Sequence, residues 1–174
     1  MRNRIIALFS LFALLFSGNE AEAASTEARA TATILTAISA SKNTTTDTGG
    51  DLAFGVIVPS ESSGTVTIAP SNSERTRAGG VVLVASTSGA ASFNISGAAN
   101  TIYTVTLPDT DAINISSGSN TMTVHQFTVY PPSGSAKLGS DGLATFSVGG
   151  KLEVGANQPT GNYIGAFDVT VSYQ

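Results

Sequence analysis

Apolar and polar side chains alternate one for one along several short stretches of this chain. In the first stretch, Ala28, Ala30, Ala32 and Ile34 alternate with Arg29, Thr31 and Thr33. A period of two is typical of a β-strand that buries one face. The pattern recurs at residues 65–68, 92–96 and 103–107, and further strands are predicted over Ala112–Ser116, Thr121–Tyr130, Leu143–Val148, Lys151–Val154 and Tyr163–Tyr173.

Glycine, proline and asparagine clusters separate these stretches and predict turns. They occur at residues 48–50, 70–72, 79–80, 117–120, 131–134 and 141–142. The Gly149-Gly150 pair predicts a two-residue hairpin, because two glycines can adopt the positive φ angles of such a turn. Eight or nine short strands without a helical stripe predict an all-β fold of two packed antiparallel sheets, a β-sandwich, with a closed barrel as the alternative.

The first residues have the pattern of a secretory signal peptide. Arg2 and Arg4 precede an apolar run over residues 5–16, and the small residues Ala21 and Ala23 follow. Basic residues hold the start on the cytoplasmic side, and the two alanines fit the small pockets of signal peptidase. The run is shorter than the roughly 20 apolar residues that span a membrane. We therefore expect export through the Sec pathway and a mature protein without a transmembrane segment.

Composition narrows the classes of function. The 174-residue chain has no cysteine, no tryptophan and a formal net charge of −4. Thiol catalysis and thiolate metal sites are therefore excluded, and stability must come from burial and backbone hydrogen bonds. Nucleic-acid binding needs a concentrated basic face, which this chain lacks. The roughly 150 residues after the signal peptide are enough for one domain.

One residue and one short motif resemble parts of catalytic sites, and neither has the partners that catalysis needs. His125 lies in a predicted strand without a second imidazole or a recognisable nucleophile, so we expect a solvent-side or hydrogen-bonded structural role. The segment 39–42 (Ser-Ala-Ser-Lys) matches the Ser-x-x-Lys pattern of acyl enzymes. A threonine-rich loop follows it, and neither a Ser-Asp-Asn nor a Lys-Thr-Gly partner is present. We interpret that match as chance in a serine-rich chain.

Two pairs of aspartates are the remaining candidates for a functional site, as calcium ligands. Asp109 and Asp111 follow a proline, and Asp47 and Asp51 flank a glycine turn, so calcium could find oxygen ligands at either place. Because the carboxylate density is far below that of an EF-hand loop, aspartates that cap their own turns are the preferred interpretation. Residues 74–77 (Glu-Arg-Thr-Arg) predict a solvated loop. No catalytic residue, metal ligand or cofactor is assigned.

Four segments together resemble a known family. They are residues 51–55 (Asp-Leu-Ala-Phe-Gly), 64–68 (Gly-Thr-Val-Thr-Ile), 148–150 (Val-Gly-Gly) and, above all, 161–163 (Gly-Asn-Tyr) running into 167–173 (Phe-Asp-Val-Thr-Val-Ser-Tyr). Their order and spacing resemble bacterial domain-of-unknown-function family 4402 over nearly the whole mature chain. That family is pilin-like, similar in style to spore coat protein U and to chaperone–usher fimbrial subunits. The resemblance implies an immunoglobulin-like sandwich at the envelope or cell surface and implies no catalytic residues.

The fimbrial analogy implies a mechanism of assembly. A subunit that lacks one strand exposes a groove, and the N-terminal segment of a neighbour supplies the missing strand. The candidate donor side chains are Ala28, Ala30, Ala32 and Ile34. The candidate acceptor core consists of Tyr163, Phe167, Val169 and Val171. Many fimbrial subunits carry a disulfide, which this chain lacks, and the N-terminal segment could instead pair within its own sandwich.

These expectations divide the chain into a signal peptide (residues 1–23), an N-terminal strand segment (24–40) and a β-sandwich domain (41–174). Our first hypothesis is a non-catalytic subunit of a pilus or other surface assembly, which implies self-assembly or other pilin-like partners, a periplasmic chaperone and an outer-membrane usher. It would reside in the periplasm, in a fimbrium at the cell surface or outside the cell. The alternative is a monomeric envelope or matrix protein that binds a partner or a sugar. A hydrolase comes last, because it would need a serine and a carboxylate beside His125.

Overall fold

The computed structural model describes residues 25–108 and 112–174, and the chain divides into two units, residues 1–33 and 34–174. In the described part of the first unit, residues 25–33, there is no helix or strand and every residue is exposed. In the second unit, Ile34 exposes 95% of its surface. The strand predicted from Ala28 to Ile34 is therefore wrong for this chain alone. In the described part of the chain, residues 28–34 make none of the backbone hydrogen bonds that a strand requires.

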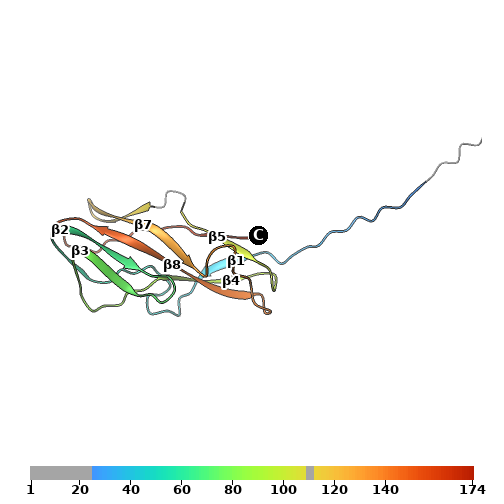
Figure 1. Cartoon of the computed structure of the whole chain (residues 1–174), viewed down its shortest axis with the longest axis horizontal. Coiled ribbons are helices and arrows are strands. Elements are labelled where there is room, and N and C mark those ends of the chain that lie inside the picture. Colours follow the sequence, from blue (N-terminus) through green and yellow to red (C-terminus); the bar gives the residue numbers. More distant parts are fainter. Residues whose placement is uncertain (1–24, 109–111) are drawn as a thin grey trace, which may run out of the picture. The chain divides into compact units, whose positions relative to one another are not determined.

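Nine antiparallel strands and no helix make up the described part of the second unit, which confirms the all-β sandwich prediction (Figure 1). The strands are β1 (Ser39–Lys42), β2 (Ile57–Ile68), β3 (Arg75–Leu83), β4 (Ala91–Ser96), β5 (Tyr103–Thr106), β6 (Ala112–Ser117), β7 (Asn120–Tyr130), β8 (Leu143–Val154) and β9 (Thr170–Tyr173).

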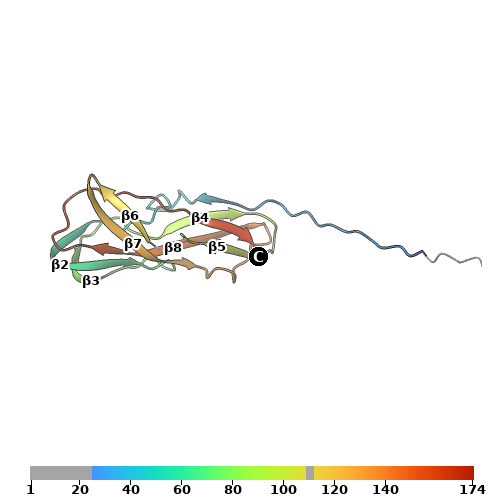
Figure 2. The same ribbon diagram turned by 90° about the horizontal axis from the view of Figure 1, so that it is seen from above.

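Strand β8 is the centre of the larger sheet. It pairs with β7 along one edge, and along the other edge with β4 in its first half and β2 in its second. Strands β1, β3 and β6 lie outside β4, β2 and β7, while β5 and β9 form a separate two-stranded sheet. Strands β7 and β8 lie side by side in both views (Figure 2). The larger sheet is open, because its strand order ends at β1 and β3.

The hairpin predicted at Gly149-Gly150 is wrong, because both glycines lie inside the uninterrupted strand β8. A Cβ atom on Gly149 would collide with the carbonyl oxygen of Ile68 and lie 2.8 Å from Pro70. A Cβ atom on Gly150 would lie 3.4 Å from the side chains of Phe127 and Val124. The two glycines allow neighbouring segments of the same chain to pack closely against β8. Their role is therefore close packing and not a turn.

The loop predicted over residues 74–77 is wrong, because β3 begins at Arg75. The turn predicted at Gly79-Gly80 does not separate two strands, because β3 includes both glycines. The Arg75 guanidinium nevertheless donates to the Val84 carbonyl at 2.7 Å. Nine residues of straight strand span about 30 Å, beyond the reach of an arginine side chain. The strand therefore bends back on itself at Gly79, where φ is +75°.

The partner strand β2 bends at the same place. Its register against β3 shifts between Pro59 and Gly64. A Cβ atom on Gly64 would lie 2.7 Å from the Ala78 carbonyl oxygen, so only glycine fits there. Bulges of this kind turn a pair of strands without breaking it. The shift directly follows residues 50–59, which form one side of the site described below.

The strand predicted from Tyr163 to Tyr173 is much shorter than expected. Only β9, Thr170–Tyr173, forms, and the preceding residues carry a single bridge between Ile164 and Ser116. The stretch predicted at residues 65–68 is only the end of β2, and the segments 143–148 and 151–154 merge into β8. The other predicted strands are confirmed to within one or two residues.

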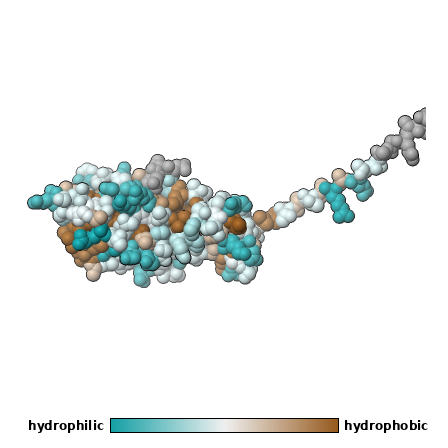
Figure 3. All heavy atoms as spheres, in the orientation of Figure 1, coloured by the Kyte–Doolittle hydropathy of each residue, from teal (hydrophilic) through white to brown (hydrophobic). Residues whose placement is uncertain are grey.

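The core is made of inward side chains from both sheets, with Phe146, Ile68, Ile95, Leu138 and Tyr103 among the largest fully buried ones. Burial raises the pKa of the Tyr103 hydroxyl above its usual value, because the phenolate form would lose solvation. A group of exposed apolar residues also lies over β2 and β3 (Figure 3). It contains Val56, Val58, Val82 and Val84, and Val58 lies opposite Val82 in the β2–β3 register.

Candidate functional site

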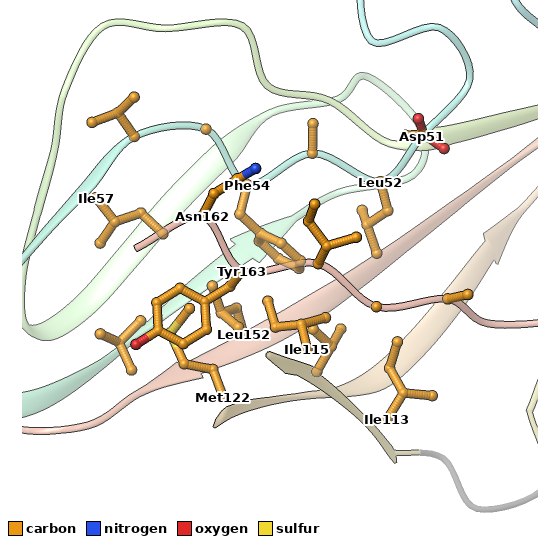
Figure 4. A pocket seen from close by; sticks show the side chains of 18 of the residues that line it. Asp51, Leu52, Phe54, Ile57, Ile113, Ile115, Met122, Leu152, Asn162 and Tyr163 are labelled. Atoms are coloured by element: carbon orange, nitrogen blue, oxygen red, sulfur yellow. The ribbon is translucent and has the colours of Figure 1, made fainter. Parts of the chain in front are cut away.

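A long apolar groove of about 1090 Å³ runs between two segments that lie outside regular strands over most of their length. Residues 50–59 form one wall and residues 158–167 form the other. Side chains of β4, β6, β7 and β8 form the floor, among them Phe93, Ile113, Ile115, Met122, Val124 and Leu152. Figure 4 shows Leu52, Phe54 and Ile57 on one side of this space and Tyr163 facing them. The groove therefore opens the sandwich interior to the surface.

The first wall has a free backbone edge toward the groove. Ala53 exchanges both backbone hydrogen bonds with Gly89, each at 2.9 Å, on the side away from the groove. Successive backbone groups of an extended chain point to opposite sides, so those of Leu52 and the N–H of Phe54 point toward the groove. Within the described part of the chain, these groups have no hydrogen-bond partner.

Arg75 holds this wall in place. Its guanidinium donates to the Phe54 carbonyl at 2.9 Å and to the Val84 carbonyl at 2.7 Å, which joins the wall to the chain behind it. Gly55, with φ of +72°, makes room, because a Cβ atom there would collide with the Arg75 guanidinium. The wall is thus fixed by charge-assisted hydrogen bonds even though its inner edge is unpaired.

The same glycine changes the phase of the side-chain alternation. Leu52 and Phe54 face the groove before Gly55, and Ile57 faces it afterwards, while Val56 is 53% exposed. A positive φ interrupts the regular alternation of an extended chain, so the inward positions shift from even to odd numbers. This shift hides the wall from a search for strict alternation. The only sequence signal was the Asp-Leu-Ala-Phe-Gly segment, which carried the family resemblance and not a site prediction.

The second wall also has a free backbone edge. Ile164 exchanges both hydrogen bonds with Ser116 of β6, at 2.9 and 3.0 Å. The backbone groups of Tyr163 and Gly165 therefore point the other way, toward the groove. Neither residue has a backbone hydrogen bond to any described residue. Two unpaired edges thus border one apolar floor.

Side-chain contacts anchor the second wall at both ends. The Tyr163 hydroxyl donates to the Pro159 carbonyl at 2.7 Å and accepts from Gln158 Nε2 at 2.9 Å. Further along, the ring of Phe167 lies 5.1 Å from the ring of Phe127, centroid to centroid. Both inward side chains are only half-buried, because no strand among the described residues covers them on the groove side.

The structure divides the predicted acceptor residues into two pairs. Tyr163 and Phe167 line the groove. Val169 and Val171 are half-buried against the hydrophobic core, beyond the groove lining. Sequence reasoning missed the floor residues Ile113, Ile115, Met122 and Leu152, because nothing in their strands distinguishes a groove floor from an ordinary buried face.

Charge in the groove is confined to one end. Lys42 Nζ and Asp51 Oδ1 form an ion pair at 2.8 Å, and both residues belong to the groove lining. Both are largely solvent-exposed, so the pair contributes little to stability. Mutual neutralisation leaves a groove that favours apolar side chains and backbone partners over a charged ligand.

The residues weighed for catalysis do not converge. His125 Nε2 lies 2.9 Å from Glu153 Oε1 across the β7–β8 pair, and no serine hydroxyl in the described residues hydrogen-bonds to the ring. Ser39 and Lys42 lie in strand β1, where positions three apart face opposite sides, so their side chains do not meet. This arrangement differs from the helical one of acyl enzymes.

Metal binding receives no support from the residues that the structure describes, among which no cluster of three His, Asp or Glu side chains occurs. Asp51 pairs with Lys42. Asp109 and Asp111 lie outside the described residues, as do Ala21 and Ala23 of the predicted signal peptidase site. The described residues also include no helix long and apolar enough to cross a bilayer.

Comparison with known families gives one match. The family model described as Domain of unknown function (DUF4402) matches residues 43–173, which is most of the chain. The chain belongs to this family. Comparison with curated proteins and with solved structures found no match. Both groove walls lie inside the matched DUF4402 region, and the exposed residues 25–33 precede it.

Proposed function

We propose that this protein is a non-catalytic, secreted structural subunit of a pilus, fimbria or other cell-surface assembly. Its groove accepts the extended N-terminal segment of another copy. The observation that carries the proposal is the groove itself, in which two unpaired backbone edges flank an apolar floor. Such a slot has the features of a missing strand, because an inserted strand would pair with both edges and cover the floor.

The N-terminal segment has the complementary features. Ala28, Ala30, Ala32 and Ile34 lie on one face of an extended chain, and all four are exposed. On insertion, that face would bury against the floor, while Arg29 and Thr31 would point to solvent. Burial of apolar surface and new main-chain hydrogen bonds would both favour the complex. The same logic makes other pilin-like subunits, a periplasmic chaperone and an outer-membrane usher natural partners.

A monomeric envelope or matrix protein is the second candidate. The same groove would then hold an extended segment of a different protein, since its chemistry recognises an extended apolar-faced chain and little else. Residues 25–33 form no strand, which favours the first proposal, because a segment held in its own sheet would pair with a neighbouring strand. The two proposals differ in whether the chain assembles with itself.

Size-exclusion chromatography with light scattering separates them. The proteins are the mature chain from Ala24 and a truncation that begins at Leu35, which keeps Ile38 and its core contacts. The longer chain should form concentration-dependent oligomers, the truncation should stay monomeric, and a mixture should contain one-to-one complexes. A synthetic peptide of residues 24–38 should bind the truncation, and a scrambled peptide should not.

A matched pair of substitutions tests the mode of insertion. Ala32→Asp places a charge on the inserted face and should weaken assembly at least a hundredfold, because an unpaired buried charge is costly. Thr31→Asp adds the same charge to the solvent face and should leave assembly nearly unchanged. A longer chain that stays monomeric at every concentration, together with a truncation that unfolds, would contradict the proposal. Equal effects of both substitutions would contradict the face assignment.

A further inference from the structure

The hydroxyl of Tyr173 joins two segments that lie far apart in the sequence. It donates to the backbone carbonyl of Thr36 and accepts from the backbone N–H of Ala98, each at 2.6 Å. Tyr173 is the last residue of β9, and Thr36 precedes β1 by three positions. The C-terminal strand therefore holds the chain at the base of the N-terminal segment.

The surroundings of this hydroxyl leave little freedom. A Cβ atom on Gly97 would collide with the Tyr173 hydroxyl and lie 3.0 Å from Leu138 Cδ1, so a larger residue there would displace the tyrosine. The N–H of Gly97 donates to the Gly142 carbonyl at 2.9 Å, which fixes the turn that carries Ala98. The hydroxyl thus connects a rigid turn to Thr36.

Most residues on both sides of Thr36 are exposed, but hydrogen bonds to the domain begin at this residue. On its N-terminal side, Ile34 is 95% and Leu35 is 51% exposed. On its other side, Ile38 packs against the hydrophobic core, and the Ser39 hydroxyl lies 2.8 Å from that of Ser96. Among the described residues from Ser25 onward, Thr36 is therefore the first that makes a hydrogen bond.

We propose that Tyr173 is a positioning residue that fixes the exit point of the N-terminal segment. The two hydrogen bonds set the boundary at Thr36, so that the free segment ends at Leu35. Eleven residues from Ser25 to Leu35 span about 36 Å when extended. Loss of the hydroxyl frees Thr36 and Ala37 as well, which lengthens the segment and exposes Ile38. This inference concerns the free chain and stands apart from whether the segment is donated.

Limited proteolysis with thermolysin, which cleaves before bulky apolar residues, tests it on the mature chain. Cleavage before Leu35 serves as the internal reference, because that site is exposed in every variant. In the native protein, cleavage before Ile38 should be rare. Tyr173→Phe should raise the ratio of Ile38 cleavage to Leu35 cleavage at least fivefold. Hydrogen exchange at the Ala98 amide, which loses its acceptor, should accelerate at least tenfold.

Three further variants make the result specific. Gly97→Ala should give the same cleavage pattern with the tyrosine still present. Tyr130→Phe removes an exposed hydroxyl that has no hydrogen bond in the described residues, and it should give the native ratio. Val171→Ala weakens β9 without touching the hydroxyl and should also give the native ratio. An unchanged ratio in Tyr173→Phe, or an equal rise in Val171→Ala, overturns the proposal.

Assembly distinguishes this inference from the proposed function. If the segment is donated, Tyr173→Phe should still assemble, but with a longer and more protease-sensitive linker between subunits. If no variant assembles while the cleavage ratio still rises, the proposed function fails and the role of Tyr173 stands.

Discussion

Residues 28–34 and residues 163–169 have the same side-chain periodicity, and neither segment forms a regular strand. The first is wholly exposed, while the second keeps Tyr163, Phe167 and Val169 half-buried along the sandwich interior. The first segment has an apolar face and forms no strand, and the second forms one wall of the groove. Alternation of side chains therefore determines which face of a segment is apolar. A strand forms only where the edge of another strand is available for backbone hydrogen bonds.

The largest expected effect is the loss of stability when an inward ring of the second segment is removed. Phe167→Ala should lower the free energy of unfolding by about 2 kcal/mol, less than for a fully buried ring because Phe167 is half-buried. Urea denaturation followed by circular dichroism measures this. The exposed neighbour Asp168 provides the control, since Asp168→Ala should change stability by less than about 0.5 kcal/mol. Equal losses in the two variants would contradict the assigned orientation of this wall.

The corresponding change in the other segment should leave the fold intact. Ile34→Ala should not alter the free energy of unfolding of the monomer, because the side chain is almost fully exposed. It should weaken assembly by about tenfold, equivalent to about 1.4 kcal/mol of lost apolar burial in the complex. The assembly midpoint from light scattering reports this, with Thr33→Ala as the control. A monomer destabilised by Ile34→Ala would show that the segment packs on its own domain.

A smaller effect is expected where the second segment begins. Tyr163→Phe removes the hydrogen bonds to Pro159 and Gln158 and should lower stability by about 1 kcal/mol. Hydrogen exchange should accelerate over residues 155–165 and remain unchanged over residues 34–38. Tyr130→Phe provides a tyrosine control of the same chemistry. Uniform acceleration along the whole chain would argue against a local anchor.

The smallest expected effect is a loss of stability that appears only at alkaline pH. Burial raises the pKa of Tyr103, which lies opposite Tyr173 in the β5–β9 pair. Above about pH 10, the unfolded chain loses this proton before the folded chain does, so the unfolded state binds fewer protons. The free energy of unfolding should therefore fall as pH rises above 10 and be unaffected below it. Tyr103→Phe should flatten this decline, and an unchanged slope would contradict the assignment.

Most of the strand content could be predicted from sequence, because strands that bury one face show it directly in their side chains. Strands β4 and β5 lie where alternation places them, and β6 and β7 lie where further strands are predicted. Only part of the groove could be predicted from the sequence. Tyr163 and Phe167 follow the period, whereas the wall around Phe54 does not, because Gly55 shifts the phase between Phe54 and Ile57.

Two glycine pairs mark the limit of local prediction. Both Gly79-Gly80 and Gly149-Gly150 have the local chemistry of a turn. The first bends a strand at a positive φ, while the second admits the chain at Ile68 and Pro70 close to a straight strand. The sequence alone determined the all-β class, the inward face of most strands and the donor-like pattern of residues 28–34. Only the tertiary structure decided which edges find a partner, because backbone pairing joins residues that lie far apart in the chain.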